Sequence, residues 1–403
     1  MPDLIASRPY YSDSYRTTFE TTVIETGVIA GRPMAILAAT WFYPSSGGQP
    51  HDTGILGGRQ VVDVLVREED RHVVHVLDGP IDPGPVQGRI DWARRWDHMQ
   101  QHTGQHVLSQ AFVNLASAPT IGFHLGTDYV SIDLKIAELP DPVREAAFGL
   151  AGDVVRANHE VRAWFPTAAE LAALPLRKTP EVDGAVRIVA IGSFDVSACG
   201  GTHVRRTGEI GLIQWLWTER LKRGFRVAFL CGDRARADYA LKHRLTADLA
   251  AQLACSPVEL PAAVTRLQAE LITLRRAVEK HHEEALDQEA GLLRAEAVVR
   301  GQGLVIEKRF VNRPVDDLKG LAIRVTAEAG VVALLATGGE RTHFVFSRDE
   351  RSAVALKPAL EAALAVIGGG KGGGSRIVQG GGGPAAPSQI DAALAAAVGT
   401  LPA

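Results

Sequence analysis

The residue types best suited to metal chemistry fall in two short segments. His98, His102 and His106 recur every four residues in "HMQQHTGQH", and "CGGTH" places Cys199 four residues before His203. On a helix, this spacing stacks imidazoles on one face, where two of them can share a metal ion. Imidazole nitrogens with one thiolate suit a tetrahedral zinc ion, whereas the soft sulfur disfavours magnesium or calcium.

Spacing alone leaves blander interpretations open. With 13 histidines and 3 cysteines in 403 residues, roughly 0.4 HxxxH pairs and roughly 0.1 CxxxH pairs arise by chance. The histidines would then lie on an ordinary helix face, and the cysteine would be a small buried hydrophobe. Thr103 stands where HExxH peptidases have glutamate, which argues against a zinc peptidase of that class.

Four segments must position these residues. Residues 1–94 are rich in β-formers broken by Gly-Pro turns and predict a β-rich domain. Residues 95–235 mix helix and strand patterns, contain both metal-binding segments, and predict an α/β domain. Residues 236–300 show no strand pattern, and residues 301–403 return to α/β character. We therefore expect an α+β, multidomain fold with a helical coiled-coil or hairpin spacer and a small α/β C-terminal domain.

The helical spacer carries a heptad pattern. Its apolar residues step by three and four: Val264, Leu267, Leu271, Leu274 and Val278. This rhythm is typical of a coiled coil and predicts a homodimer through residues 236–403, although an intramolecular hairpin would give the same pattern.

Composition narrows the class of protein. The formal net charge of −3 gives no global basic field, so a nucleic-acid partner must be met by local patches. Three cysteines are too few for a disulfide framework and suggest a reducing compartment. The N-terminal residues lack a signal-peptide pattern, and no run approaches the length of a membrane span. We therefore expect a cytoplasmic protein without a membrane partner.

Four ordered motifs resemble one family. "HTGQH" is followed, 93 residues after His106, by "CGGTH", and "FYPSSGGQPHDTG" (42–54) precedes both. "FHLGTDYVSIDL" (123–134) and "RGFRVAFLCGDRA" (223–235) complete the order. Together they resemble the editing domain of alanyl-tRNA synthetase and of its free-standing relatives, the long AlaX type. The threonyl enzyme shares the HxxxH and CxxxH set but lacks the SGGQ segment in this arrangement.

The C-terminal part continues the resemblance. "GGGKGGGSRIVQGGGG" (368–383) looks like the glycine-rich segment of the C-terminal domain of alanyl-tRNA synthetase. A flexible linker is the alternative, but helix-like patterns flank the segment on both sides. Glycine backbone can approach phosphate closely, and Lys371 and Arg376 supply positive charge.

The resemblance implies a trans-editing deacylase that hydrolyses Ser-tRNA(Ala), and also Gly-tRNA(Ala), at one zinc ion per chain. It implies the ligands His102 and His106 first, then Cys199, and His203 last. It also implies that no ATP-dependent aminoacylation domain accompanies the editing region. Two alternatives stay open: a deacylase with threonyl-type or broad tRNA specificity, and a non-catalytic tRNA-binding module with structural zinc.

Other residues are weaker candidates. The expected catalytic residues are His124, Gln105 and Thr202, although Gln105 on an exposed helix face and Thr202 in a simple turn are alternatives. Cations beside aromatic residues suit phosphate neutralisation and base stacking. The expected tRNA-binding residues are Gly47, Gly48, Gln49, Arg94, Arg95, Lys222, Arg223, Lys371 and Arg376.

Overall fold

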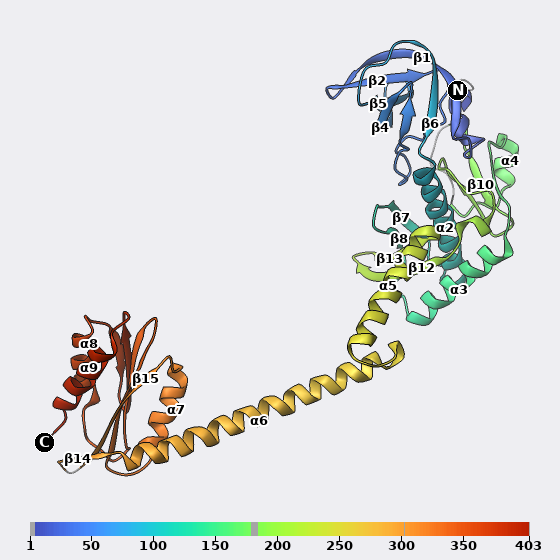
Figure 1. Cartoon of the computed structure of the whole chain (residues 1–403). Helices are drawn as coiled ribbons and strands as arrows, with labels where there is room; N and C mark the ends of the chain where they lie inside the picture. Colours follow the sequence, from blue (N-terminus) through green and yellow to red (C-terminus); the bar gives the residue numbers. More distant parts are fainter. Residues whose placement is uncertain (1–4, 179–183, 302, 403) are drawn as a thin grey trace. The chain divides into compact units, whose positions relative to one another are not determined.

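A computed structural model describes residues 5–178, 184–301 and 303–402 (Figure 1). Helices and strands are mixed, and the chain divides into two compact units, Met1–Leu249 and Ala250–Ala403. The prediction of an α+β, multidomain fold is confirmed, whereas the division into four domains stays a prediction. Among the described residues, no helix combines the length and the apolar character needed to cross a membrane.

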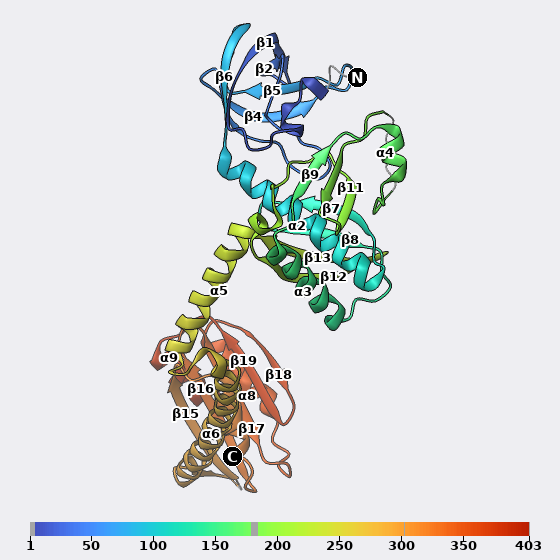
Figure 2. The ribbon, with the colours of Figure 1, turned by 90° about the vertical axis from the view of Figure 1, so that its right-hand side faces the viewer.

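The first unit begins with a closed barrel. Its strands, in the order β1-β2-β5-β4-β3-β6, are β1 (Thr18–Ile29), β2 (Arg32–Leu37), β3 (Gly54–Leu56), β4 (Arg59–Val66), β5 (Val73–Leu77) and β6 (Gly84–Ile90). Phe19, Val23, Val64 and Leu77 are among the apolar side chains that fill it. Strand β6 leads almost directly into helix α2 (Trp92–Ala116), which leaves the barrel in Figure 2.

Helix α2 is the central element of this unit. The Asp91 side chain caps its first turn by accepting a hydrogen bond from the Arg94 amide, and Ser117 ends it in a left-handed conformation. All side chains from His98 to Ser109 are buried. A helix buried on every side must satisfy its polar groups with protein partners, because water does not reach them.

Two sheets and three helices surround or follow α2. One antiparallel sheet, in the order β12-β13-β8-β7, contains β7 (Thr120–Leu125), β8 (Val130–Leu134), β12 (Ile213–Leu221) and β13 (Gly224–Cys231). The other, in the order β11-β10-β9, contains β9 (Val161–Trp164), β10 (Ile188–Ile191) and β11 (Asp195–Ala198). The helices are α3 (Asp141–Ala157), α4 (Ala168–Ala173) and α5 (Gly232–Gln252).

The second unit is a helix-covered sheet. Its strands, in the order β14-β15-β16-β17-β19-β18, are β14 (Val298–Arg300), β15 (Gly303–Val311), β16 (Val331–Gly338), β17 (Thr342–Arg348), β18 (Lys371–Gly374) and β19 (Ile377–Gly382). The end of α6 (Leu260–Ala295) and α7 (Val315–Val325) pack on one face, and α8 (Leu356–Val366) and α9 (Pro387–Gly399) pack on the other.

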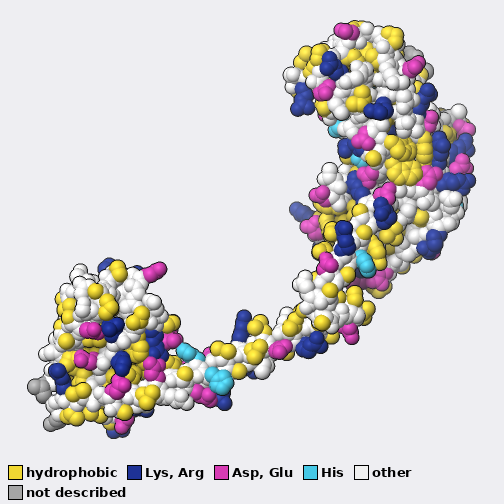
Figure 3. All heavy atoms as spheres, viewed as in Figure 1, with side chains coloured by type: hydrophobic (Ala, Val, Ile, Leu, Met, Phe, Trp, Pro, Cys, Tyr) yellow, Lys and Arg dark blue, Asp and Glu magenta, His cyan; other side chains and the backbone are white. Residues whose placement is uncertain are grey.

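The heptad residues lie on α6, a single helix of 36 residues. Figure 3 shows hydrophobic side chains at the surface of this helix. The exposed ones include Val264, Leu267, Leu271, Leu274 and Val278. Among the described residues, only the C-terminal part of α6 joins a hydrophobic core, so the heptad row stays exposed.

Candidate metal centre

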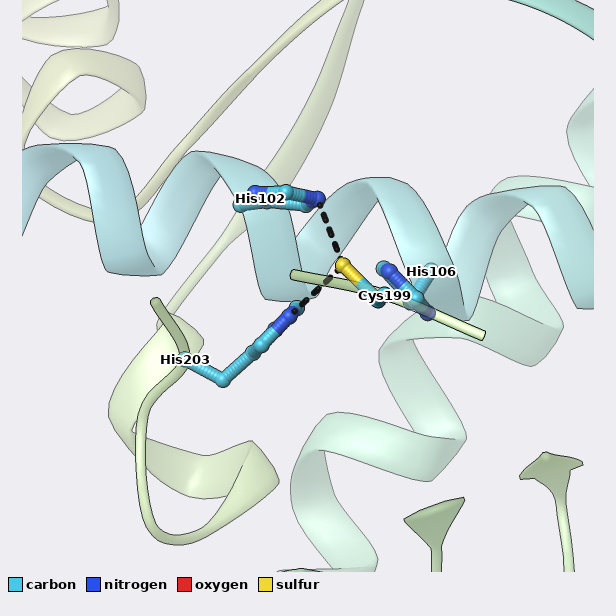
Figure 4. A group of neighbouring side chains, drawn as sticks. All are labelled: His102, His106, Cys199 and His203. Carbon is cyan, nitrogen blue, oxygen red and sulfur yellow. Dashed lines mark hydrogen bonds between the residues drawn. The ribbon is translucent and has the colours of Figure 1, made fainter. Parts of the chain in front are cut away.

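Four side chains converge beside the middle of helix α2. His102 and His106 come from α2, whereas Cys199 and His203 come from the loop after β11 (Figure 4). One ligand atom from each lies within 4.8 Å of all the others. The Cys199 Sγ atom lies 3.3 Å from the Nε2 atoms of both His102 and His203.

The outer nitrogen of His102 is fixed by a glutamine from the barrel. Gln49 Oε1 lies 2.8 Å from His102 Nδ1 and also accepts a hydrogen bond from the backbone N–H of Thr202. The Thr202 amide can only donate, so Oε1 is the acceptor and His102 Nδ1 must carry the proton. This tautomer leaves the lone pair of Nε2 facing Cys199.

The tautomers of His203 and His106 follow from their hydrogen-bond partners in the same way. Thr103 Oγ1 donates to the Met99 carbonyl, so at 3.1 Å it accepts from His203 Nδ1. Asp195 Oδ2 lies 3.0 Å from His106 Nδ1, and an ionised carboxylate only accepts. All three imidazoles therefore donate outward from Nδ1 and keep Nε2 for a shared ligand.

Backbone clamps shape the loop that carries Cys199. The buried Arg187 guanidinium donates to the carbonyls of Cys199 and Gly201 at 2.9 and 2.8 Å, and to the Tyr11 carbonyl. A Cβ atom on Gly201 would lie 2.2 Å from the His102 ring, so this close approach of loop and helix requires glycine.

The electrostatics favour a thiolate. Burial by itself raises the pKa of the Cys199 thiol, but the imidazoles of His102, His203 and His106 outweigh it and hold this pKa well below its usual value. Burial also lowers the pKa of His106, but the Cys199 and Asp195 anions outweigh that effect and raise it to about 9. In the metal-free chain this is a thiolate beside a protonated imidazole, and a metal ion would displace that proton.

These residues fit zinc. Bonds of about 2.0–2.3 Å at tetrahedral angles place two zinc ligands about 3.3–3.6 Å apart. The two Cys199–histidine separations of 3.3 Å are close to this range, and all four ligand atoms lie within 4.8 Å of one another. Each imidazole also has the outer hydrogen-bond partner that zinc-binding histidines usually have. The donor set of three nitrogens and one thiolate is one that zinc prefers.

A cavity of about 260 Å³ opens onto this group. His102, His106 and Cys199 form part of its wall, whereas His203 does not. Phe123 and Arg177 line it as well. A ligand in the cavity would therefore meet three of the four side chains of the candidate metal centre.

The three expected catalytic residues lie in different positions relative to the cavity. Gln105 lines the cavity and donates to Ser109 Oγ at 2.7 Å, so it is buried and not on an exposed helix face. Thr202 is buried off the cavity wall and holds Gln49 by two hydrogen bonds. His124 is exposed and absent from the wall, because its neighbour Phe123 points inward and successive strand residues point to opposite faces. The structure does not support a catalytic His124.

Two of the residues expected to contact tRNA are buried in the first unit. Arg95 is completely buried and forms an ion pair with Asp52, with Nε 3.0 Å from Oδ1, so it joins the barrel loop to α2. Gln49 is buried against His102 and Thr202. Both side chains face inward, Arg95 to pair with Asp52 and Gln49 to hold His102.

The remaining expected contacts lie at the surface. Gly47 lines the cavity, and the carbonyl of Gly48 accepts a hydrogen bond from the Leu125 amide. Arg94 is half-buried and donates to the His51 carbonyl. Lys222 and Arg223 are exposed in the turn between β12 and β13.

The glycine-rich segment forms a second cavity in the second unit. Residues 368–383 are ordered as the β18–β19 hairpin and are not a free linker. The hairpin lines a cavity of about 950 Å³ together with Lys319, Arg341 and His343. Lys371 lies on this wall, whereas Arg376 lies outside it and pairs with Glu350.

Sequence reasoning missed Asp195, Ser197 and Thr103. Ser197 Oγ lies 3.0 Å from His106 Nδ1 and 3.2 Å from Asp195 Oδ2. A signal was available, because Asp195, Ser197 and Cys199 alternate in "DVSAC" and alternate strand residues share a face. Arg177 and Arg187 carry no comparable signal.

Comparisons with known proteins identify the family. Residues 186–226 match the model of the threonyl and alanyl tRNA synthetase second additional domain. The alanine–tRNA ligase of Pyrococcus furiosus is 33% identical over 373 residues, covering 89% of this chain but only 40% of the ligase. The alanyl-tRNA editing protein AlaX-L of Pyrococcus horikoshii is 30% identical over 378 residues, covering 91% of this chain and 92% of the relative. The chain spans less than half the length of the ligases, and by its match to nearly all of AlaX-L it belongs to the alanyl-tRNA editing family.

Proposed function

We propose that the chain hydrolyses the aminoacyl ester of tRNA(Ala) mischarged with serine or glycine, at one zinc ion held by His102, His106, Cys199 and His203. The observation that carries this proposal is the convergence of three outward-donating imidazoles and a thiolate, of which His102, His106 and Cys199 line one cavity. Its family membership supports the substrate class.

The chemistry of an aminoacyl ester suits such a site. The ester is already activated, so a deacylase needs a positioned water, a stabilised developing charge and a pocket. Bound zinc would supply Lewis-acid polarisation or a bound water of lowered pKa. The cavity of about 260 Å³ has room for an aminoacyl group and part of a ribose.

The chain's own residues hold the site in shape. Gln49 and Asp195 orient two imidazoles, and the buried Arg187 fixes the Cys199 loop. Gln105, held by Ser109, presents a polar side chain to the cavity. A buried polar group of this kind is what discrimination of serine from alanine requires, because an apolar pocket distinguishes the two poorly.

Contacts with the body of the tRNA are proposed for two places. Gly47 lies on the wall of the metal-site cavity, where the terminal nucleotide would enter, and Lys222 and Arg223 are exposed on the same unit. In the second unit, Lys371, Lys319 and Arg341 surround a glycine backbone that phosphate can approach. We also propose that the exposed heptad row of α6 pairs with a second copy of the chain.

The first test is deacylation of Ser-tRNA(Ala), Gly-tRNA(Ala) and Ala-tRNA(Ala) by the purified full chain, with zinc measured in the same sample. We expect the mischarged species to be hydrolysed, Ala-tRNA(Ala) to be spared, and about one zinc per chain. Zinc without hydrolysis would favour a tRNA-binding module. Equal hydrolysis of Ser-tRNA(Thr) would favour broad specificity, and hydrolysis without zinc would refute the metal assignment.

A further inference from the structure

Arg177 lies beside the metal centre and lines the same cavity as His102, His106 and Cys199. It precedes β10 by several residues, and its backbone N–H donates to the Val196 carbonyl of β11 at 2.8 Å. Its side chain is 14% exposed and lines the 260 Å³ cavity. The guanidinium is therefore held against the strand that carries Asp195 and Ser197.

One edge of the guanidinium faces the partners of His106. Arg177 Nε lies 3.2 Å from Asp195 Oδ1, and Nη2 donates to Ser197 Oγ at 3.3 Å. The other carboxylate oxygen, Asp195 Oδ2, accepts from His106 Nδ1. An unbroken series of contacts thus runs from the cavity wall through Arg177 and Asp195 to a metal-binding imidazole.

His106 differs from the other two histidines in its partner. His102 donates to an amide oxygen and His203 to a hydroxyl, whereas His106 donates to a carboxylate. A buried carboxylate needs a compensating cation, and Arg177 is the arginine that forms an ion pair with it. A carboxylate held in this way orients its histidine and makes it a stronger ligand.

We propose that Arg177 is a positioning residue that sets the metal-binding imidazole of His106 through Asp195. The inference rests on the proposed metal site and deepens it. The same guanidinium lines the cavity, so it lies close to where a substrate would bind while it acts on the metal ligand.

A double-mutant cycle on the full chain tests this inference. Zinc affinity is measured by competition with a chelator for wild type, Arg177→Met, Asp195→Asn and the double variant. We expect Asp195→Asn to weaken zinc about ten- to a hundredfold and Arg177→Met about tenfold. Because both act through one contact, the double variant should match Asp195→Asn. Arg162→Met, an exposed arginine on β9, is the control and should bind zinc normally.

Two readouts separate positioning from a merely structural role. The cobalt-loaded Arg177→Met variant should show an altered absorption spectrum, and its kcat should fall while KM changes little. Arg177→Lys keeps the positive charge but loses the planar set of N–H donors. It should therefore recover part of the zinc affinity that Arg177→Met loses. If Arg177→Met does not fold, the same double-mutant cycle is measured with Arg177→Lys in its place, together with Asp195→Asn.

The outcomes are distinct. Effects that multiply in the double variant, or a raised KM at unchanged zinc affinity, would overturn the positioning role and leave the proposed function standing. Failure of the wild type to bind zinc would remove the metal assignment, and the inference with it.

Discussion

The metal-site cavity of the first unit is walled mostly by residues with side chains, whereas half of the residues that line the cavity of the second unit are glycine. Around Cys199, the side chains of Gln49, Thr103 and Asp195 each hold one imidazole. Around the β18–β19 hairpin, half of the lining residues are glycine, and a Cβ atom on Gly372 would lie 2.6 Å from the Cα of Gly380.

This difference indicates a division of labour. Chemistry on an ester needs groups fixed to a fraction of an ångström, which requires buried and satisfied side chains. Binding a phosphate backbone needs close approach and charge, which exposed cations beside bare backbone supply. Substitutions in the two cavities should therefore change different measured quantities.

The largest effect is expected for Cys199→Ala. Removing the thiolate deletes a ligand, so we expect loss of bound zinc and a fall in the deacylation rate of about a hundredfold or more. Zinc content and single-turnover hydrolysis of Ser-tRNA(Ala) measure both. Cys255→Ala, outside the cluster, should retain both. Full activity in Cys199→Ala would contradict the assignment of ester hydrolysis to the metal-site cavity.

Gln49→Ala should have the next largest effect. It removes the acceptor that fixes the His102 tautomer, so zinc affinity should fall about ten- to a hundredfold. The measurement is chelator competition on the full chain. Gln60→Ala, an exposed glutamine of β4 in the same barrel, is the matched control. An unchanged zinc affinity would show that Gln49 does not orient His102 for metal binding.

In the second unit, Lys371→Ala combined with Arg341→Ala should weaken tRNA binding. Each cation that neutralises a phosphate contributes about one unit to the slope of log affinity against log salt, so we expect a slope lower by about two and about tenfold weaker binding. Hydrolysis of a short acceptor-stem substrate should be unchanged. Lys308→Ala, whose lysine pairs with Glu296, serves as the control. Slower cleavage of the short substrate would contradict the division of labour.

The smallest effect on the two cavities is expected for substitutions in the heptad row, which should change only the oligomeric state. Leu267→Glu with Leu271→Glu places charges in the exposed heptad row of α6, so a dimer should become a monomer of half the mass. Light scattering on the full chain measures this, with Gln268→Glu on the same helix as the control. A mass that the double substitution leaves unchanged would exclude pairing through this row.

Much of the metal centre was accessible from sequence, because its spacing is local. An i, i+4 pair lies on one helix face whatever surrounds the helix, and "CGGTH" carries its glycine beside its ligands. The roles of Arg95 and Gln49 were not accessible. Arg95 beside tryptophans resembles a nucleic-acid patch, but its partner Asp52 lies 43 residues away. His124 failed for a related reason, since strand alternation does not tell which face meets the cavity.

The sequence by itself determined the α+β class, the family and the two segments that meet at the metal centre, because residue type and periodicity are properties of the chain. Only the tertiary structure decided which nitrogen each histidine presents and which polar side chains turn inward. Those outcomes depend on packing between residues such as Gln49 and His102, 53 positions apart. A buried polar group must find its partner wherever the fold places one, and that place is not written in local sequence.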